Sequence, residues 1–427
     1  MRSALCFAGG IALLFIVCAW KMGAARAEGA TAVPERPALA ASAPLALRVS
    51  PHRHSLPRLQ LLPGARGMRD GGHPSIRGVT VGPIESLLQP GRGYGSPAFA
   101  ATLDEIKRRG ANWISLTVFG RVWDARSVGI DWDFERPVEE TRRAVEDAVQ
   151  MAHARGLRVM LVPHLWLESG EWRAEMRPEN DRRFEVWAQN YQSFVVHWAK
   201  VAESSGVDLY ATGVELRSWV TSSRAPRFVQ VIQAVREQFS GLLTYAANWD
   251  DAQDTLVWSH LDVVGINAFY QLHWENGATF TQLMEGGLRV RASVKQLAAS
   301  LDKPVIFTEV GYTARANTSI EPWLWPEQLA EVEPDFRAQH RAYAALLDAL
   351  HELPGFSGAF VWRMYADVSD LSQEPDWGFS PWGKPAMRAL TRTFESRTFG
   401  DPPRAEALVA QQARSRELSV PGRADGF

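Results

Sequence analysis

Eight short runs of apolar, often β-branched residues recur along the middle of the chain. Each run is apolar almost throughout instead of at alternate positions, which is typical of parallel strands buried on both faces. The predicted strands are 76–82, 112–118, 157–163, 207–213, 242–247, 261–268, 304–309 and 358–363.

Stretches with helical periodicity separate most of these runs, at 96–109, 136–154, 181–203, 228–239, 287–300 and 335–352. Gly110, Gly156 and Gly206 each stand just past a predicted last turn, where a left-handed residue commonly ends a helix. Strands that alternate with helices predict an α/β fold, a (β/α)8 TIM barrel over about 75–398. The alternative, a doubly wound open sheet, would need a glycine-rich phosphate turn after the first strand, and Gly82-Pro83-Ile84-Glu85 lacks it.

The two ends of the chain have different compositions. Arg2, an apolar run over 4–20 and the small-residue sequence Ala25-Arg26-Ala27 predict a signal peptide over 1–27, and so an exported protein, secreted or periplasmic. An uncleaved N-terminal segment that tethers the protein to a membrane is the alternative, because a bilayer span needs about 20 apolar residues. Residues 28–72 are predicted to be a Pro/Ala/Arg-rich linker, and 399–427 a charged flexible tail.

Charge and composition narrow the classes of partner. With 46 Lys and Arg against 48 Asp and Glu, the net charge of −2 gives no basic field for a nucleic acid. The 17 Trp exceed what a core needs and indicate a ligand with flat apolar faces. Both cysteines, Cys6 and Cys18, lie in the N-terminal run, and no H-E-x-x-H motif occurs, so we predict no metal site.

Two carboxylates end otherwise apolar strands. Glu215 follows the fourth predicted strand and Glu309 ends the seventh. Taken singly, either could bond a neighbouring Arg or a backbone amide, because a buried carboxylate needs a partner. Strands four and seven lie across an eight-stranded ring, so the two side chains can face each other. A pair about 5–5.5 Å apart suits double displacement at a sugar carbon.

Aromatic and amide side chains end several other strands, where a barrel carries its active site. Aromatic faces stack on the C–H face of a pyranose, and Asn or His bonds its hydroxyls. Packing under a loop is the alternative for each residue, and we assign Trp258 to it. The predicted substrate-binding residues are His164, Trp166, Asn248, Trp249, Asn267, Tyr270, Tyr312 and Trp362.

Seven segments of the sequence resemble glycoside hydrolase family 113, over about residues 75–398. They are 93–97 (GYGSP), 110–116 (GANWISL), 162–166 (VPHLW), 212–216 (TGVEL), 244–249 (TYAANW), 307–312 (FTEVGY) and 380–386 (SPWGKPA). The resemblance implies the clan of retaining (β/α)8 glycosidases and hydrolysis of β-1,4-mannan or glucomannan. It also implies Glu215 as acid/base, Glu309 as nucleophile, and neither a metal nor an organic cofactor.

One position departs from the wider clan, which usually has Asn before the acid/base, in contact with the sugar 2-hydroxyl. This chain has Val214, so we expect Asn248 or Asn267 to make that contact. For the mechanism we expect an ionised Glu309 and a raised pKa at Glu215. The remaining alternatives are a glycosidase or transglycosylase that acts on envelope glycan, and a catalytically silent carbohydrate-binding barrel. In each case we expect a carbohydrate ligand and no obligatory protein partner.

Overall fold

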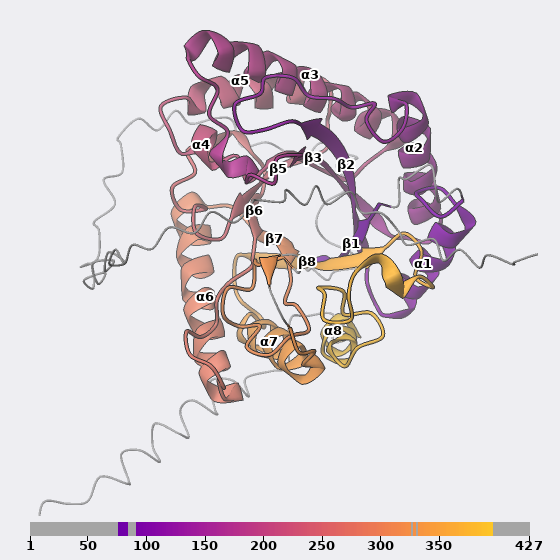
Figure 1. Cartoon of the computed structure of the whole chain (residues 1–427), viewed down its shortest axis with the longest axis vertical. Helices are drawn as coiled ribbons and strands as arrows, with labels where there is room; N and C mark the ends of the chain where they lie inside the picture. The colour runs from indigo at the N-terminus through magenta and orange to yellow at the C-terminus, as the bar shows by residue number, and fades with distance from the viewer. Residues whose placement is uncertain (1–75, 84–90, 326–327, 330–331, 396–427) are drawn as a thin grey trace, which may run out of the picture. The chain divides into compact units, whose positions relative to one another are not determined.

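The fold is a closed barrel of eight parallel strands that pair in chain order, with helices around it (Figure 1). The computed structural model describes residues 76–83, 91–325, 328–329 and 332–395. Its strands are β1 (Ile76–Gly82), β2 (Trp113–Val122), β3 (Arg158–Leu167), β4 (Leu209–Val214), β5 (Leu242–Asn248), β6 (Val264–Asn267), β7 (Val305–Val310) and β8 (Phe356–Tyr365). The predicted (β/α)8 barrel is confirmed.

Helices follow the strands and pack outside the barrel (Figure 1). They are α1 (Pro97–Arg108), α2 (Val138–Ala154), α3 (Asp181–Ser205), α4 (Arg217–Val220), α5 (Ala225–Arg236), α6 (Phe280–Leu301), α7 (Phe336–Ala349) and α8 (Ala386–Glu395). Short 3-10 turns include η1 (Arg173–Glu175), η2 (Trp258–His260) and η4 (Leu371–Gln373). The long α3 ends at Gly206, whose φ of 76° is the left-handed conformation that the sequence predicted there.

The α6 helix begins seven residues before the predicted start at 287. Thr279 and Gln282 form a capping box that starts it at Phe280. The pair Gly286-Gly287, which looked like a boundary, lies inside the helix at close contacts. A Cβ on Gly286 would meet the backbone oxygen of Leu272 at 2.1 Å. Close contact of Gly286 with the loop after β6, and of Gly287 with α7, therefore explains two glycines that weaken the helical pattern.

The centre of the barrel is filled by large side chains from several strands. Ile76, Trp113, Met160, Leu209, Ile306 and Phe360 belong to one fully buried cluster. Phe360 lies over Gly78, where a Cβ would meet its ring at 2.3 Å. Since this core is packed, the chemistry is confined to the carboxyl ends of the strands.

Three predictions concern residues outside the described part of the chain: the signal peptide at 1–27, the linker at 28–72 and the tail at 399–427. They stay predictions. Among the described helices, none combines the length and the apolar character that a membrane crossing requires.

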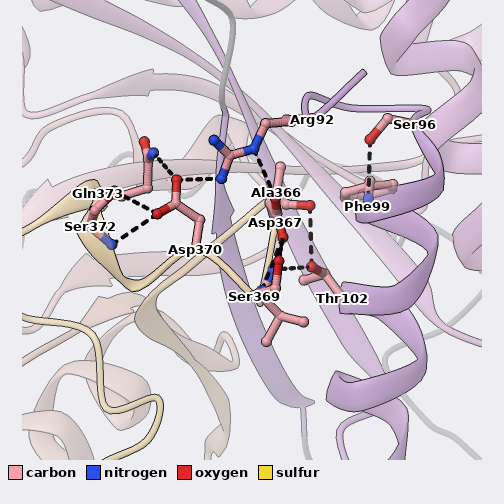
Figure 2. Close-up of polar contacts among 11 residues, drawn as sticks. Arg92, Ser96, Phe99, Thr102, Ala366, Asp367, Ser369, Asp370, Ser372 and Gln373 are labelled. Carbon is pink, nitrogen blue, oxygen red and sulfur yellow. Dashed lines mark hydrogen bonds and ion pairs between the residues drawn. The ribbon is translucent and has the colours of Figure 1, made fainter. Parts of the chain in front are cut away.

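Polar contacts join the loop after β1 to the loop after β8, the pair of strands that closes the barrel (Figure 2). Arg92 Nε donates to Asp367 Oδ2 at 2.8 Å, and Arg92 also pairs with Asp370. The Thr102 hydroxyl in α1 donates to the backbone oxygen of Ala366 at 3.1 Å. Burial opposes ionisation of Asp370, but hydrogen bonds from Ser372, Gln373 and Arg92 outweigh it and lower its pKa to about 2.

We expect Asp370→Asn to destabilise the protein at pH 7, with a difference that shrinks as the pH falls. A depressed carboxyl pKa stabilises the fold above its unfolded value of about 3.9, and this stabilisation is lost as the pH falls through the folded value of about 2. The melting temperatures of both proteins between pH 2 and 7 test this. Asp181→Asn is the control, because that side chain is 97% exposed in its pair with Arg224. A pH-independent difference would contradict the expectation.

Candidate active site

Glu215 and Glu309 both lie at the carboxyl ends of strands, in the mouth of the barrel. Glu215 directly follows β4, and its backbone nitrogen donates to Ala246 in β5 at 2.8 Å. Glu309 lies within β7, and its backbone oxygen accepts from Ala268 at 2.7 Å. The two residues are only 7% and 8% exposed. Backbone hydrogen bonds to neighbouring segments therefore fix the main chain from which both carboxylates extend.

Asn267, the last residue of β6, connects the two carboxylates. Its Nδ2 donates to Glu215 Oε1 at 2.9 Å, and its side chain also hydrogen-bonds Glu309. The Thr308 hydroxyl donates to Asn267 Oδ1 at 2.8 Å, which turns the NH2 group toward the acids. The charge of Glu215 also raises the pKa of Glu309, so the two carboxyl groups lie close enough to interact electrostatically.

Two donors on the loop after β3 face the other oxygen of Glu215. Trp172 Nε1 donates to Oε2 at 3.0 Å, and Arg173 Nη1 forms an ion pair with it at 2.8 Å. The sequence analysis missed both residues. Their position after a predicted strand was the one available signal, because nothing in the local pattern distinguishes Arg173 from a solvated surface charge.

His164 holds Arg173 in place. Its Nδ1 lies 3.0 Å from the backbone oxygen of Leu165 and can only donate there, so Nε2 accepts from Arg173 Nη2 at 3.1 Å. Arg173 Nε donates to the same oxygen of Leu165 at 3.1 Å. Burial, together with the charge of Arg173, lowers the pKa of His164 well below its usual value. The imidazole is therefore neutral and serves as an acceptor for Arg173.

Of the two carboxyl groups, Glu309 is the one that has a clearly raised pKa. Burial and the neighbouring Glu215 raise the pKa of Glu309 to about 8, against the opposing effects of Arg173, Arg363 and Asn267. We had expected an ionised Glu309 beside a Glu215 of raised pKa. Glu309 differs because burial and the neighbouring carboxylate both oppose its charge, although two cations, Arg173 and Arg363, lie near it. The pair thus retains a proton near neutral pH.

Aromatic side chains line the mouth in two groups. In the first, Trp325 lies between Trp166 and Trp362, with edge-to-face contacts at 6.4 Å to each. Trp166 is 41% exposed, whereas Trp362 is 6% exposed and shares a cluster with Phe269 and Phe379. Trp325 belongs to the loop after β7 and was missed, because a Trp in a loop carries no periodic signal.

In the second group, Trp249 stacks on Trp323 at 5.5 Å and contacts Tyr270 at 5.6 Å. Trp323 also follows β7 and was also missed. Tyr270 is 8% exposed, so its ring mainly supports Trp249. The contacts with Trp323 and Tyr270 therefore fix the orientation of the Trp249 indole next to the loop after β7.

Three residues considered from the sequence, Asn248, Tyr312 and Trp258, have polar side-chain contacts to groups other than the two carboxylates. Asn248 donates through Nδ2 to Asp250 Oδ1 at 2.7 Å, so its amide faces the loop after β5. Tyr312 is fully buried, and its hydroxyl donates to the backbone oxygen of Tyr270 at 3.1 Å. The structure does not bring this hydroxyl to the carboxylates. Trp258 is buried with its Nε1 on Ala252, which confirms its packing role.

Arg217, in α4, supports the donors of Glu215 from outside. Its guanidinium lies 4.8 Å above the ring of Trp172, and it pairs with Asp250 and, at 2.9 Å, with Asp251. Burial raises the pKa of Asp251 to about 6, although Arg217 opposes the rise.

Within the described residues, no three His, Cys, Asp or Glu side chains are grouped so as to hold a metal ion.

Comparison with known proteins places this geometry in a family. The structure is similar to that of the GH113 β-mannanase AaManA from Alicyclobacillus acidocaldarius in complex with ManMIm, with a TM-score of 0.65 and 23% identity over 76% of this chain and 98% of that one. A GH113 β-1,4-mannanase complex gives a TM-score of 0.63 and 22% identity over 75% and 99%. A family 5 mannosidase from Rhizomucor miehei gives 0.52 and 11% over 76% and 92%.

These likenesses to solved structures support the barrel fold. Among curated proteins, no relative matches the sequence. The sequence profile of glycoside hydrolase family 113 matches residues 89–384, which is more than half of the chain. The chain therefore belongs to glycoside hydrolase family 113.

Proposed function

We propose that this glycosidase is a retaining β-mannanase that cleaves β-1,4-mannan or glucomannan by double displacement. The observation that carries the proposal is the pair of buried carboxylates, Glu215 and Glu309, bonded to one amide of Asn267. The choice of sugar rests on the family and on the β-mannanases that the structure resembles. An exported protein, with 1–27 as signal peptide or membrane tether, is part of the proposal.

In the first step Glu309 attacks the anomeric carbon while Glu215 protonates the leaving oxygen. The retained proton must therefore reside on Glu215 when the sugar is bound. Positive charge that develops on the sugar stabilises an ionised Glu309, which moves the proton toward Glu215. Asn267 bonds both carboxylates and keeps them aligned during this exchange.

In the second step Glu215 removes a proton from the water that releases the sugar, so it must be ionised. Arg173, Trp172 and Asn267 together donate three hydrogen bonds to its carboxylate. This arrangement suits the base form.

Asn267 is also our choice for the contact to the sugar 2-hydroxyl that the wider clan makes with Asn before the acid/base. Val214 occupies that position here and is buried in the inner barrel cluster. Of the two expected substitutes, Asn248 bonds Asp250, whereas Asn267 reaches both acids.

A glycosidase or transglycosylase that acts on envelope glycan would use the same carboxylates. Product analysis separates it from a mannanase, because water and a sugar acceptor compete for one intermediate. A catalytically silent carbohydrate-binding barrel would have no need for the buried pair, whose mutual repulsion carries a cost. Purified protein should therefore be screened on mannan, glucomannan, xylan, β-glucan and aryl glycosides, with NMR reading the anomer first released.

We expect Glu215→Gln and Glu309→Gln to lower mannan hydrolysis at least about a thousandfold without loss of the fold, because one removes the acid/base and the other the nucleophile. Azide should restore turnover of an activated aryl β-mannoside by Glu215→Gln and give the β-mannosyl azide, because that variant keeps the nucleophile and azide attacks its glycosyl-enzyme. Kinetics and circular dichroism measure both effects. Glu203→Gln is the control, because its carboxylate bonds Ser240 away from the mouth. Full activity in either variant would refute the assignment.

We expect the kcat/KM of the wild-type enzyme to fall on the alkaline side with an apparent pKa near 8, where the pair loses its last proton. Arg173 lowers the pKa of Glu309, so Arg173→Ala should move this limb to higher pH. Profiles on an aryl β-mannoside measure the shift. Arg177→Ala, on the same loop and 48% exposed, should leave the limb in place. A shift to lower pH in Arg173→Ala would contradict this electrostatic account.

A further inference from the structure

The loop between β2 and α2 forms a second hollow with aromatic walls, outside the site described above. Its volume is about 600 Å³, and Trp123 and Phe134 line it. The two residues are 72% and 55% exposed, which is unusual for large apolar side chains. Since β2 ends at Val122, the hollow opens on the same face of the barrel as Glu215 and Glu309.

A continuous series of ring contacts leads from the active site to this hollow. The Phe119 ring lies 5.3 Å from the His164 ring and 6.2 Å from the Trp166 ring. The guanidinium of Arg121 then lies 5.6 Å from Trp166 and 5.2 Å from Phe134. A glycan chain bound at the carboxylates and passing over Trp166 would therefore reach the hollow next.

The backbone that carries Trp123 is anchored at several points. Arg121 and Asp131 exchange two backbone hydrogen bonds of 2.8 Å, and the Trp123 oxygen accepts from Ser169 at 2.9 Å. Arg121 is fixed by ion pairs with Glu135 and, at 3.2 Å, with Glu168. The aromatic platform is thus preorganised, and a ligand would bind it with little ordering cost.

The charges around the hollow select among ligands. The lining holds one cation, Arg121, and three carboxylates, those of Asp131, Asp133 and Glu168, so it carries a negative balance. This balance opposes an acidic polysaccharide or a nucleic acid. Flat aromatic faces beside planar polar groups match an uncharged pyranose, whose C–H face stacks while its hydroxyls bond carboxylates and guanidinium.

We propose that the Trp123–Phe134 hollow is a distal subsite that binds sugar units of a long, uncharged β-glycan whose reacting unit lies at Glu215 and Glu309. The proposal rests on the proposed function. It assigns a preference for polymeric over short substrates to the loop between β2 and α2, whereas Glu215 and Glu309 belong to the ends of β4 and β7. Trp123 and Phe134 contribute binding, and they take no part in the displacement itself.

The test compares kcat/KM on glucomannan with kcat/KM on an aryl β-mannobioside, which has only two sugar units to extend from the carboxylates. We expect Trp123→Ala to lower the ratio of the two constants about tenfold, and Phe134→Ala to lower it in the same direction, because each removes a stacking face. Trp274→Ala is the matched control: this Trp is 63% exposed on the loop after β6, beside Arg289. Its ratio should equal that of the wild type.

An unchanged ratio in Trp123→Ala, or an equal fall in Trp274→Ala, would overturn the distal subsite and leave the proposed function intact. If the wild type hydrolyses neither substrate, the proposed function fails instead. Electrophoresis through gels that contain glucomannan then decides the subsite. Retardation of the wild type that Trp123→Ala loses supports it, and equal mobility of the two proteins refutes it.

Discussion

Repulsion between two carboxylates buried side by side is the constraint around which the mouth of the barrel is organised. Each acid is more than nine-tenths buried, and both bond the amide of Asn267. A pair of like charges at this depth is stable only with a shared proton or a nearby cation. The protein supplies both, because the pKa of Glu309 is raised and Arg173 binds Glu215.

Closure of the barrel makes this pairing possible. In the closed barrel, β5 and β6 lie between β4 and β7. Glu215 follows β4 and Glu309 lies in β7, so the two side chains face each other across the mouth. Asn267 ends β6, beside Glu309 in the strand register, so the same hydrogen bonds that hold the sheet also place the bridging amide. Thr308, one residue before Glu309, then fixes how that amide is turned.

Strand order and the positions of strand ends could be predicted from the sequence, since continuous apolar runs and helix-ending glycines have local causes. This was enough to place Glu215, Glu309 and Asn267 at the carboxyl ends of strands, as the structure has them. Arg173 could not be found, because its role depends on a loop that folds back over the mouth. Tyr312 was misleading for a related reason: it follows Glu309 closely, but its hydroxyl turns inward to the backbone of Tyr270.

The neutral state of His164 follows from the same electrostatic balance. A protonated imidazole could not accept a hydrogen bond from Arg173, and a second cation would repel the first. Burial keeps the ring neutral, so the charges near the pair are the guanidinium of Arg173 bonded to Glu215, the guanidinium of Arg363, and the proton that the pair retains. Moving that proton between Glu309 and Glu215 then changes their roles without any change in the total charge, which suits the binding of an uncharged sugar.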